Sequence, residues 1–259
     1  MLLWQKGKEL YRDMPWRNDT RPYYVLVSEL MLQQTQVPRV IPKFEAFIAA
    51  FPDEQTLASA SLAHVLMAWQ GLGYNRRAKF LHEAAKRVVN EFEGRFPESA
   101  PELLSLPGVG TNTAGAILAY AFNTPAIFVE TNIRTVYIHH FFNDTETVDD
   151  TQILKKLNET LDREHPREFY WSLMDYGSWL KAQGVRNNTS SKHYKKQSPL
   201  EGSIRQVRGQ IVRRLVVSDC DEQTLRRELS ADGRFELALS GLLSDGLVRV
   251  TAGRLHLTK

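Results

Sequence analysis

Apolar residues recur at helical spacing over most of the first 183 positions, and the strict alternation typical of strands is missing there. Residues 75–92 are the clearest case. Their apolar side is formed by Ala78, Leu81, Ala85, Val88 and Val89, and their outward side by Arg76, Arg77, Lys79, Lys86 and Arg87. The apolar run 23–32 is typical of a buried strand or helix, and its length favours a helix. Further helices are expected at 2–14, 127–142, 149–161 and 167–183.

The pattern changes after residue 184. Residues 187–199 are polar and turn-prone, which indicates a linker. Helices are then expected at 204–216, from Asp221 onward and at 234–243, followed by two short strands around an Ala-Gly turn. Three helices and a terminal hairpin indicate a winged helix. Its third helix has few outward bases, so docking to DNA and docking to protein both stay open.

Composition narrows the class of protein. The 259 residues suffice for one large or two smaller domains and carry a net charge of only +3. Cys220 is the only cysteine, so this sequence predicts no disulfide framework and no cysteine-ligated metal site. We find no signal peptide and no membrane-length apolar run, and we expect a cytoplasmic protein. Bases dominate residues 186–214, where Glu201 is the only acid.

A Leu-Pro-Gly-Val-Gly stretch at residues 106–110 stands directly before a predicted helix. Glycine permits close backbone approach, and a helix start presents free N–H groups to an anion. A Gly-X-Gly turn is more often plain punctuation between helices. The carboxylate of Glu130, one short helix downstream, makes phosphate binding beside a reaction centre the better interpretation.

Several motifs together resemble one family. They are Pro-Trp-Arg at 15–17, Ser-Glu-Leu-Met-Leu-Gln-Gln-Thr-Gln-Val at 28–37, Gly-Leu-Gly-Tyr at 71–74, the 106–110 stretch and Thr-Ala-Gly-Ala-Ile-Leu at 113–118. Over residues 10–183 the chain resembles the helix-hairpin-helix DNA glycosylases of the endonuclease III superfamily, and most closely their MutY-type adenine branch.

The resemblance implies a mainly α fold, with a two-lobed helix-hairpin-helix glycosylase core and a C-terminal winged-helix (α+β) domain. We expect one helical lobe from residues 1–20 and 135–185 and a second, with the hairpin, from 21–134. A basic linker at 186–202 and the winged helix at 203–259 follow. The implied partner is double-stranded DNA with a damaged or mispaired base, bound by a monomer associated with the nucleoid.

The resemblance also assigns the chemistry. Glu130 matches the family's catalytic aspartate, and Asn132 matches an asparagine two residues later. Glu29 matches the glutamate that protonates the departing base, and its apolar surroundings are expected to raise its pKa. Asn112 and Thr131 are expected to line the base pocket.

DNA contacts are expected at three places. Gln33 and Gln34 resemble the intercalating and opposite-strand contacts, and Tyr74 resembles a residue near the wedge. The hairpin Pro107, Gly108, Val109 and Gly110 is expected to hold one phosphate. Lys192, Lys195 and Lys196 form a further hypothetical phosphate contact.

Four departures from the family pattern matter. Glu130 replaces the aspartate and Thr131 a glycine, so the carboxylate moves by ~1.5 Å. Asn112 stands where strand-cleaving members have a lysine, which predicts no lyase chemistry. The four cysteines of the iron–sulfur cluster are missing. A winged helix replaces the nudix-like domain, which puts 8-oxoguanine recognition in doubt. We expect no cofactor and no transition metal, although hairpin carbonyls suit a monovalent cation.

These residues predict a monofunctional DNA glycosylase of base excision repair. Adenine in a mismatch is the first candidate substrate, and a modified or mispaired pyrimidine is the second. The alternative is a non-catalytic DNA-binding damage sensor or regulator on the same scaffold, motivated by the change at Glu130 and by the winged helix.

Overall fold

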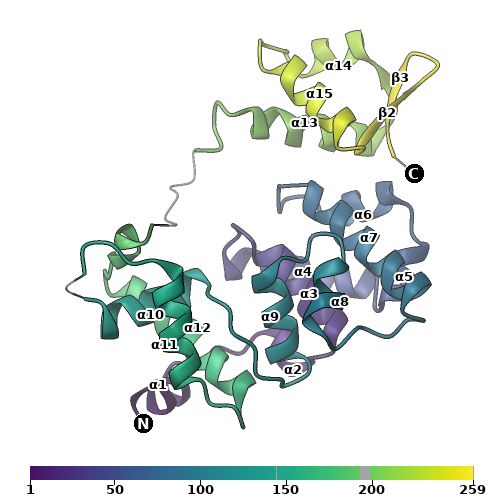
Figure 1. Cartoon of the computed structure of the whole chain (residues 1–259). Helices are drawn as coiled ribbons and strands as arrows, with labels where there is room; N and C mark the ends of the chain where they lie inside the picture. The colour runs from purple at the N-terminus through teal and green to yellow at the C-terminus, as the bar shows by residue number, and fades with distance from the viewer. Residues whose placement is uncertain (144, 193–198, 259) are drawn as a thin grey trace. The chain divides into compact units, whose positions relative to one another are not determined.

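The computed structural model describes residues 1–143, 145–192 and 199–258, most of them helical (Figure 1). Packing divides the chain into two compact units. Unit 1 comprises Met1–Leu26, Pro97–Ser105 and Val109–Lys196, and unit 2 comprises Val27–Phe96, Leu106–Gly108 and Gln197–Lys259. The four domain segments expected from the sequence follow another division, and they stay a prediction.

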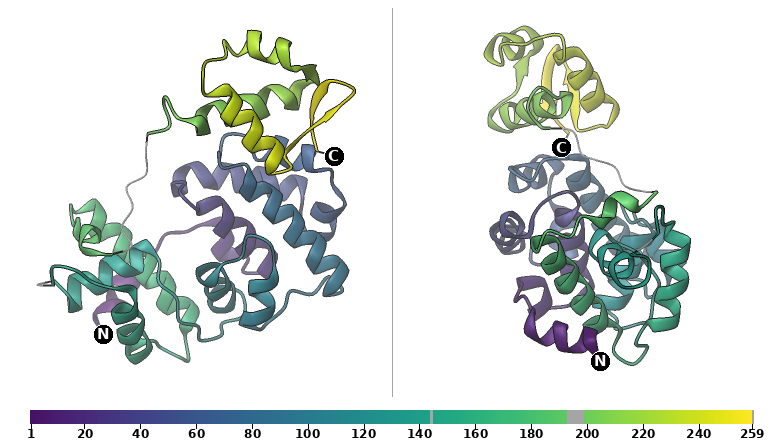
Figure 2. Two further views of the ribbon diagram at one scale, coloured as in Figure 1. Left: turned by 45° about the horizontal axis from the view of Figure 1, so that its top comes forward. Right: turned by 90° about the vertical axis from the view of Figure 1, so that its left-hand side faces the viewer.

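The expected helical block is confirmed, and two further views follow its course (Figure 2). Its elements are α1 (Leu2–Glu9), α2 (Pro15–Asn18), α3 (Pro22–Leu32), α4 (Val37–Ala50), α5 (Glu54–Ser59), α6 (Leu62–Ala68), α7 (Arg76–Glu91), α8 (Ala100–Ser105), α9 (Thr111–Tyr120), α10 (Thr131–Phe141), α11 (Asp150–Thr160), α12 (Pro166–Ala182) and the short 3-10 helix η1 (Asn187–Ser190). No helix in the described part of the chain is long and apolar enough to cross a bilayer.

The core of unit 1 is built around α12, which packs against α1, α9 and α10. Gly177 is the point of closest approach, because a Cβ there would lie 2.3 Å from the carbonyl oxygen of Asn132. Only glycine allows the first turn of α10 to approach α12 so closely. Arg134 then joins α10 to α11 through a two-point ion pair with Asp150, at 2.8 and 2.7 Å.

Two expected helices are shorter than the sequence predicted. The first ends at Glu9 instead of residue 14, because the backbone N–H of Arg12 donates to the carboxylate of Asp175. The helix expected from residue 127 begins at Thr131. Its predicted first turn is extended, since side chains from other helices bind the carbonyl oxygens of Ala126 and Val129.

The expected linker is also partly wrong. Residues 187–190 form η1, which packs on α10. The amide of Asn187 donates to the carbonyl of Thr135 at 3.0 Å, and that of Asn188 donates to the Thr135 hydroxyl at 2.8 Å. A bridge between Val148 and Ser191 closes the segment. The start of the polar stretch is therefore part of unit 1.

Arg77 corrects another prediction, because it was expected to face outward and is buried. Burial lowers its pKa to about 10, so it stays charged at neutral pH. Its guanidinium donates to the carbonyls of Gln33 at 2.6 Å and of Leu72 and Gly73 at 3.2 Å. Arg77 thus ties the end of α3 to the turn before α7.

The C-terminal part of unit 2 has the predicted order of elements. Helices α13 (Ile204–Val217), α14 (Glu222–Glu228) and α15 (Phe235–Ser244) are followed by the hairpin β2 (Val248–Thr251) and β3 (Arg254–Leu257). A short strand β1 (Cys220–Asp221), which the sequence did not predict, completes an antiparallel sheet in the order β1-β3-β2. This α+β domain is the expected winged helix.

Candidate active site and DNA-binding surface

Glu130 is the N-cap residue of α10 and is partly exposed. The strand-like segment before it is held at three points. The Tyr170 hydroxyl donates to the carbonyl of Ala126 at 2.5 Å, and the Asn112 amide donates to that of Val129 at 2.8 Å. Between them, Phe128 stacks on Tyr170 with ring centroids 4.3 Å apart. The carboxylate of Glu130 is therefore presented from a fixed backbone at a helix start, where negative charge is favoured.

Asn132 follows Glu130 by two residues, in the first turn of α10. Its Nδ2 approaches the sulfur of Met174 at 3.8 Å, while its buried Oδ1 has no hydrogen-bond partner among the described residues. A buried amide oxygen without a partner costs free energy, so it is usually found where a ligand or water completes it. The backbone of Asn132 packs closely against Gly177, and its role beside Glu130 stays a prediction.

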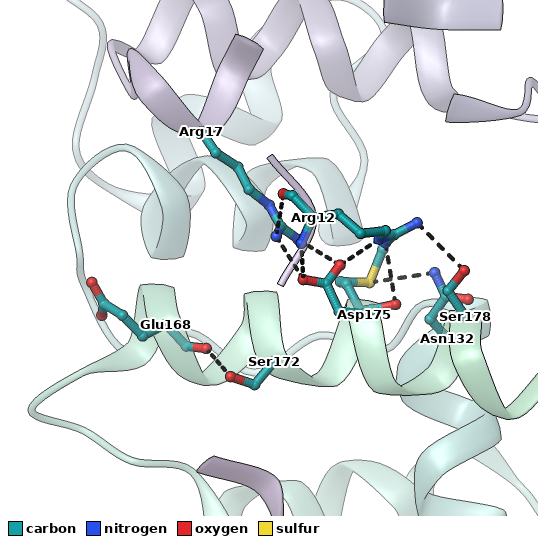
Figure 3. Close-up of polar contacts among 8 residues, drawn as sticks. Arg12, Arg17, Asn132, Glu168, Ser172, Asp175 and Ser178 are labelled. Carbon is teal, nitrogen blue, oxygen red and sulfur yellow. Dashed lines mark hydrogen bonds and ion pairs between the residues drawn. The ribbon is translucent and has the colours of Figure 1, made fainter. Parts of the chain in front are cut away.

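The sequence analysis missed a buried ion cluster on α12 (Figure 3). The carboxylate of Asp175, with 1% of its side chain exposed, receives two hydrogen bonds from Arg17 at 2.7 and 3.0 Å and one from Arg12 at 2.6 Å. The Arg17 guanidinium also lies over the ring of Trp171 at 5.2 Å. The signal was available in Pro-Trp-Arg at 15–17, whose arginine needs an acid, and in the lone acid between Leu173 and Tyr176.

Gln33, Gln34 and Tyr74 are brought together in unit 2, around one cavity of about 1010 Å³. Both glutamines are exposed at the end of α3. Gln34 has a φ of 58° and Tyr74 a φ of 49°, conformations that are unusual for residues other than glycine and recur at functional sites. Arg77 holds both segments, since it binds the carbonyls of Gln33 and Gly73.

Glu29 lies on α3 and is half-buried. It belongs to unit 2, whereas Glu130 belongs to unit 1. The predicted convergence of the two carboxylates on one nucleotide therefore stays a prediction, as does the raised pKa of Glu29.

The hairpin between α8 and α9 is the predicted phosphate-binding segment, and its role stays a prediction. Gly108 has a φ of 78°, and Val109 is buried beneath the turn. Gly110 is the N-cap of α9 and is exposed together with Thr111 and Asn112. The first N–H groups of a helix have no partner within the helix. The hairpin carbonyls remain the predicted place for a monovalent cation. The phosphate contact expected at Pro107 also stays a prediction.

Replacing Gly108 with alanine should destabilise the hairpin. The new Cβ would lie 2.7 Å from the Cβ of Phe80 and the residue would keep a left-handed φ, which together should lower the free energy of unfolding by roughly 1–3 kcal/mol. Gly110→Ala is the matched control, since a Cβ added there would have no neighbouring atom within 4 Å and the φ of Gly110 is −96°. Chemical denaturation of both variants measures the difference. Equal stability would show that the turn tolerates a side chain.

The remaining predicted residues are placed as follows. Asn112 is exposed at the start of α9, and its amide binds the carbonyl of Val129, so it positions the Glu130 segment. Thr131 is exposed, and its carbonyl accepts the Thr135 hydroxyl at 2.9 Å. Their base-pocket role stays a prediction. Lys192 is exposed and lies 3.7 Å from the Asp149 carboxylate. Lys195 and Lys196 lie outside the described residues.

An iron–sulfur cluster with four cysteine ligands does not fit this chain. Cys220 is the only cysteine of the sequence, and it is buried in the C-terminal domain of unit 2. The region after α12, where the resembling family has its cluster, is held by the Asn187 and Asn188 hydrogen bonds to Thr135.

Comparison with known proteins is consistent with this geometry. The family model of the HhH-GPD superfamily base excision DNA repair proteins matches residues 27–163, which include Glu29, the hairpin and Glu130. The chain is 33% identical to the adenine DNA glycosylase of Mycolicibacterium smegmatis over 267 residues, which cover 93% of this chain and 89% of that protein.

A second adenine DNA glycosylase and a solved glycosylase structure are also similar to this chain, over different shares of their lengths. The chain is 37% identical to the adenine DNA glycosylase of Buchnera aphidicola subsp. Baizongia pistaciae, but that match spans 65% of this chain and only 48%, about half, of the relative. Among solved structures, a thermostable thymine-DNA glycosylase superposes with a TM-score of 0.63 at 26% identity, over 68% of this chain and 82% of the other.

Proposed function

Because the chain belongs to the HhH-GPD superfamily of base excision DNA repair proteins, as a helix-hairpin-helix DNA glycosylase, we propose that it is monofunctional and hydrolyses the N-glycosidic bond of an extruded base. The observation that carries the proposal is the placement of Glu130. Its carboxylate stands at a helix start whose preceding segment is fixed by Tyr170 and Asn112, with Asn132 two residues later.

The proposed chemistry divides the work between two acids. As the bond between C1′ and the base nitrogen breaks, its electron pair passes to the base, and Glu29 supplies the proton that the base needs to leave. The sugar is left with positive charge, which Glu130 stabilises or captures. A water oxygen finally bonds to C1′, displacing the Glu130 carboxylate where it has bonded to the sugar, and the water's proton returns to the Glu29 carboxylate. The product is an abasic site on an intact strand.

Strand cleavage by an amine is not part of this proposal. Asn112 stands where the strand-cleaving members of the superfamily have lysine, and the sequence has no lysine between Lys86 and Lys155. An amide cannot form the Schiff base that this lyase chemistry requires. We therefore expect nicks only after alkali treatment.

Duplex DNA with a mispaired base is the proposed partner, and an extruded base is required because a stacked base is inaccessible. Adenine is the first candidate, since the relatives named above are adenine DNA glycosylases. Thymine or another mispaired pyrimidine is the second, because the fold also matches a thymine-DNA glycosylase. The glutamate at Glu130 and Thr131 beside it differ from the family pattern, so the pocket must suit a longer carboxylate.

A panel of end-labelled duplexes tests the proposal. Each duplex carries adenine opposite guanine, adenine opposite 8-oxoguanine, thymine opposite guanine or uracil opposite guanine, and is incubated with the protein with and without alkali. We expect one strand to break after alkali only. Cleavage of the strand that carries thymine or uracil would identify a mispaired pyrimidine, the second candidate, as the substrate. Cleavage without alkali would refute monofunctionality, and tight binding without base release on any duplex would favour the non-catalytic sensor.

A further inference from the structure

The cavity beside Gln33 and Gln34 has a second wall, which the C-terminal domain supplies. One side is formed by the end of α3, the 71–77 turn and Gly108, and the other by residues of α13, all within unit 2. Helix α13 contributes Arg205, Gln206, Arg208, Gln210 and Arg213. Four of the residues predicted to contact DNA, Gln33, Gln34, Tyr74 and Gly108, thus share one cavity with a helix that lies outside the family match at 27–163.

Charge in this cavity favours a polyanion. Among the residues that the structure describes, its lining carries Arg39, Arg76, Arg77, Arg205, Arg208 and Arg213, against the single carboxylate of Asp245. Asp245 is already engaged, since Arg208 pairs with it closely and Arg76 lies 3.8 Å away. The ammonium of Lys79 also donates to its carbonyl oxygen at 2.6 Å. Asp245 therefore acts as a tether between α7 and the domain, and the rest of the lining keeps a positive charge.

The third helix of the domain is poorly suited to bind DNA. The side of α15 that faces solvent carries Glu236, Leu237, Ser240, Leu243 and Ser244, without a single base. Arg234, just before the helix, is paired with Asp232. Phosphate binding needs cations. Although the third helix contacts DNA in many winged helices, α15 therefore lacks the charge to bind it here. The arginines of the domain that line the cavity lie on α13 instead.

Helix α13 also contacts the predicted wedge region directly. The guanidinium of Arg205 lies over the ring of Tyr74 at 4.9 Å and donates to its hydroxyl. Arg77 lies over the same ring at 5.3 Å. Tyr74 is therefore held by one cation from each wall of the cavity.

We propose that α13 is a DNA-binding helix whose exposed Arg213 and neighbouring Arg205 contact the phosphodiester backbone next to the nucleotides bound by Gln33 and Gln34. Gln206 and Gln210 line the same cavity. This inference rests on the proposed function only in taking DNA as the ligand. The C-terminal domain would then contact DNA through α13, whereas an ordinary winged helix uses its third helix.

Charge reversal tests the assignment on the full chain. Arg213→Glu should weaken binding to an undamaged duplex about tenfold near physiological salt, and should reduce the slope of log affinity against log salt by about one. Arg227→Glu is the matched control, because Arg227 is exposed on α14 of the same domain, away from the cavity lining. Arg249→Glu on strand β2 tests the ordinary winged-helix mode, and we expect it to leave the affinity unchanged.

Three binding outcomes would overturn the proposal. They are unchanged affinity and slope for Arg213→Glu, an equal loss for Arg249→Glu, and tighter binding by Arg213→Glu, which would mean that α13 blocks the site. Base release on the duplex panel is scored separately, so a protein that binds through α13 without excising a base refutes only the proposed function.

Cross-linking locates the contact independently. Arg213→Cys should form a disulfide with a duplex that carries a disulfide-tethered thiol on a backbone phosphate, whereas Arg227→Cys should not. Native Cys220 does not compete, since it is buried and burial raises the pKa of its thiol. Equal cross-linking of both variants, or of neither, would contradict the placement of α13 on the strand.

Discussion

Glu130→Gln is expected to reduce base excision by about a thousandfold, while binding of the duplex stays unchanged. The amide keeps the size of the side chain and removes the charge that would meet the sugar cation. Single-turnover assays on the substrate identified by the duplex panel measure the rate, and titration of the same duplex measures the affinity. Glu168→Gln is the control, because Glu168 is exposed on α12 in the same unit (Figure 3).

The shorter acid tests whether the pocket is built for glutamate. Glu130→Asp withdraws the carboxylate by ~1.5 Å, and a misplacement of this order is expected to cost about a hundredfold in rate. A rate for Glu130→Gln within about threefold of the parent protein would remove Glu130 from the chemistry. Faster excision by Glu130→Asp would show that the site still prefers the family's aspartate.

Asp175→Ala is expected to lower the free energy of unfolding by about 3–5 kcal/mol. The substitution would leave the Arg17 guanidinium charged and buried, with 2% of its side chain exposed. It would also remove the acceptor for the backbone N–H of Arg12. Chemical denaturation followed by tryptophan fluorescence measures the loss, and Trp171 beside Arg17 reports locally.

An exposed ion pair supplies the comparison for this variant. Asp19 pairs with Arg21 at 2.6 Å, with 37% and 52% of the two side chains exposed. Asp19→Ala should therefore cost less than about 1 kcal/mol. If Asp175→Ala costs no more than Asp19→Ala, the buried cluster does not stabilise unit 1.

Helical periodicity predicted most of the fold. The run at 23–32 was correctly interpreted as a helix, because an apolar run of this length is too long for an ordinary strand. Arg77 was missed although it stands four residues before buried Leu81, on the same face of α7. An arginine is normally placed outside, and the carbonyls at the end of α3 and in the 71–74 turn together explain its burial.

Several element boundaries could not be predicted from the sequence, because they depend on hydrogen bonds between distant residues. The start of α10 could not be found from local preference, since Asn112 and Tyr170 bind the carbonyls that would have joined its first turn. The short helix η1 is likewise held by a hydrogen bond to Thr135, which lies more than 50 positions earlier in the chain. Individual site residues came from the family motifs. The pairing of Arg12 and Arg17 with Asp175 joins two segments about 160 positions apart, and no local pattern connects them.

Arg77 has a consequence for how relatives of this chain can vary. One guanidinium binds the carbonyls at the end of α3 and those of the 71–74 turn, and each segment contains a non-glycine residue with positive φ. An insertion or deletion in either segment would shift the carbonyls away from their shared donor. Homologues should therefore change both segments in step, and an altered turn length should accompany an altered Gln-Gln end and a replacement of this arginine.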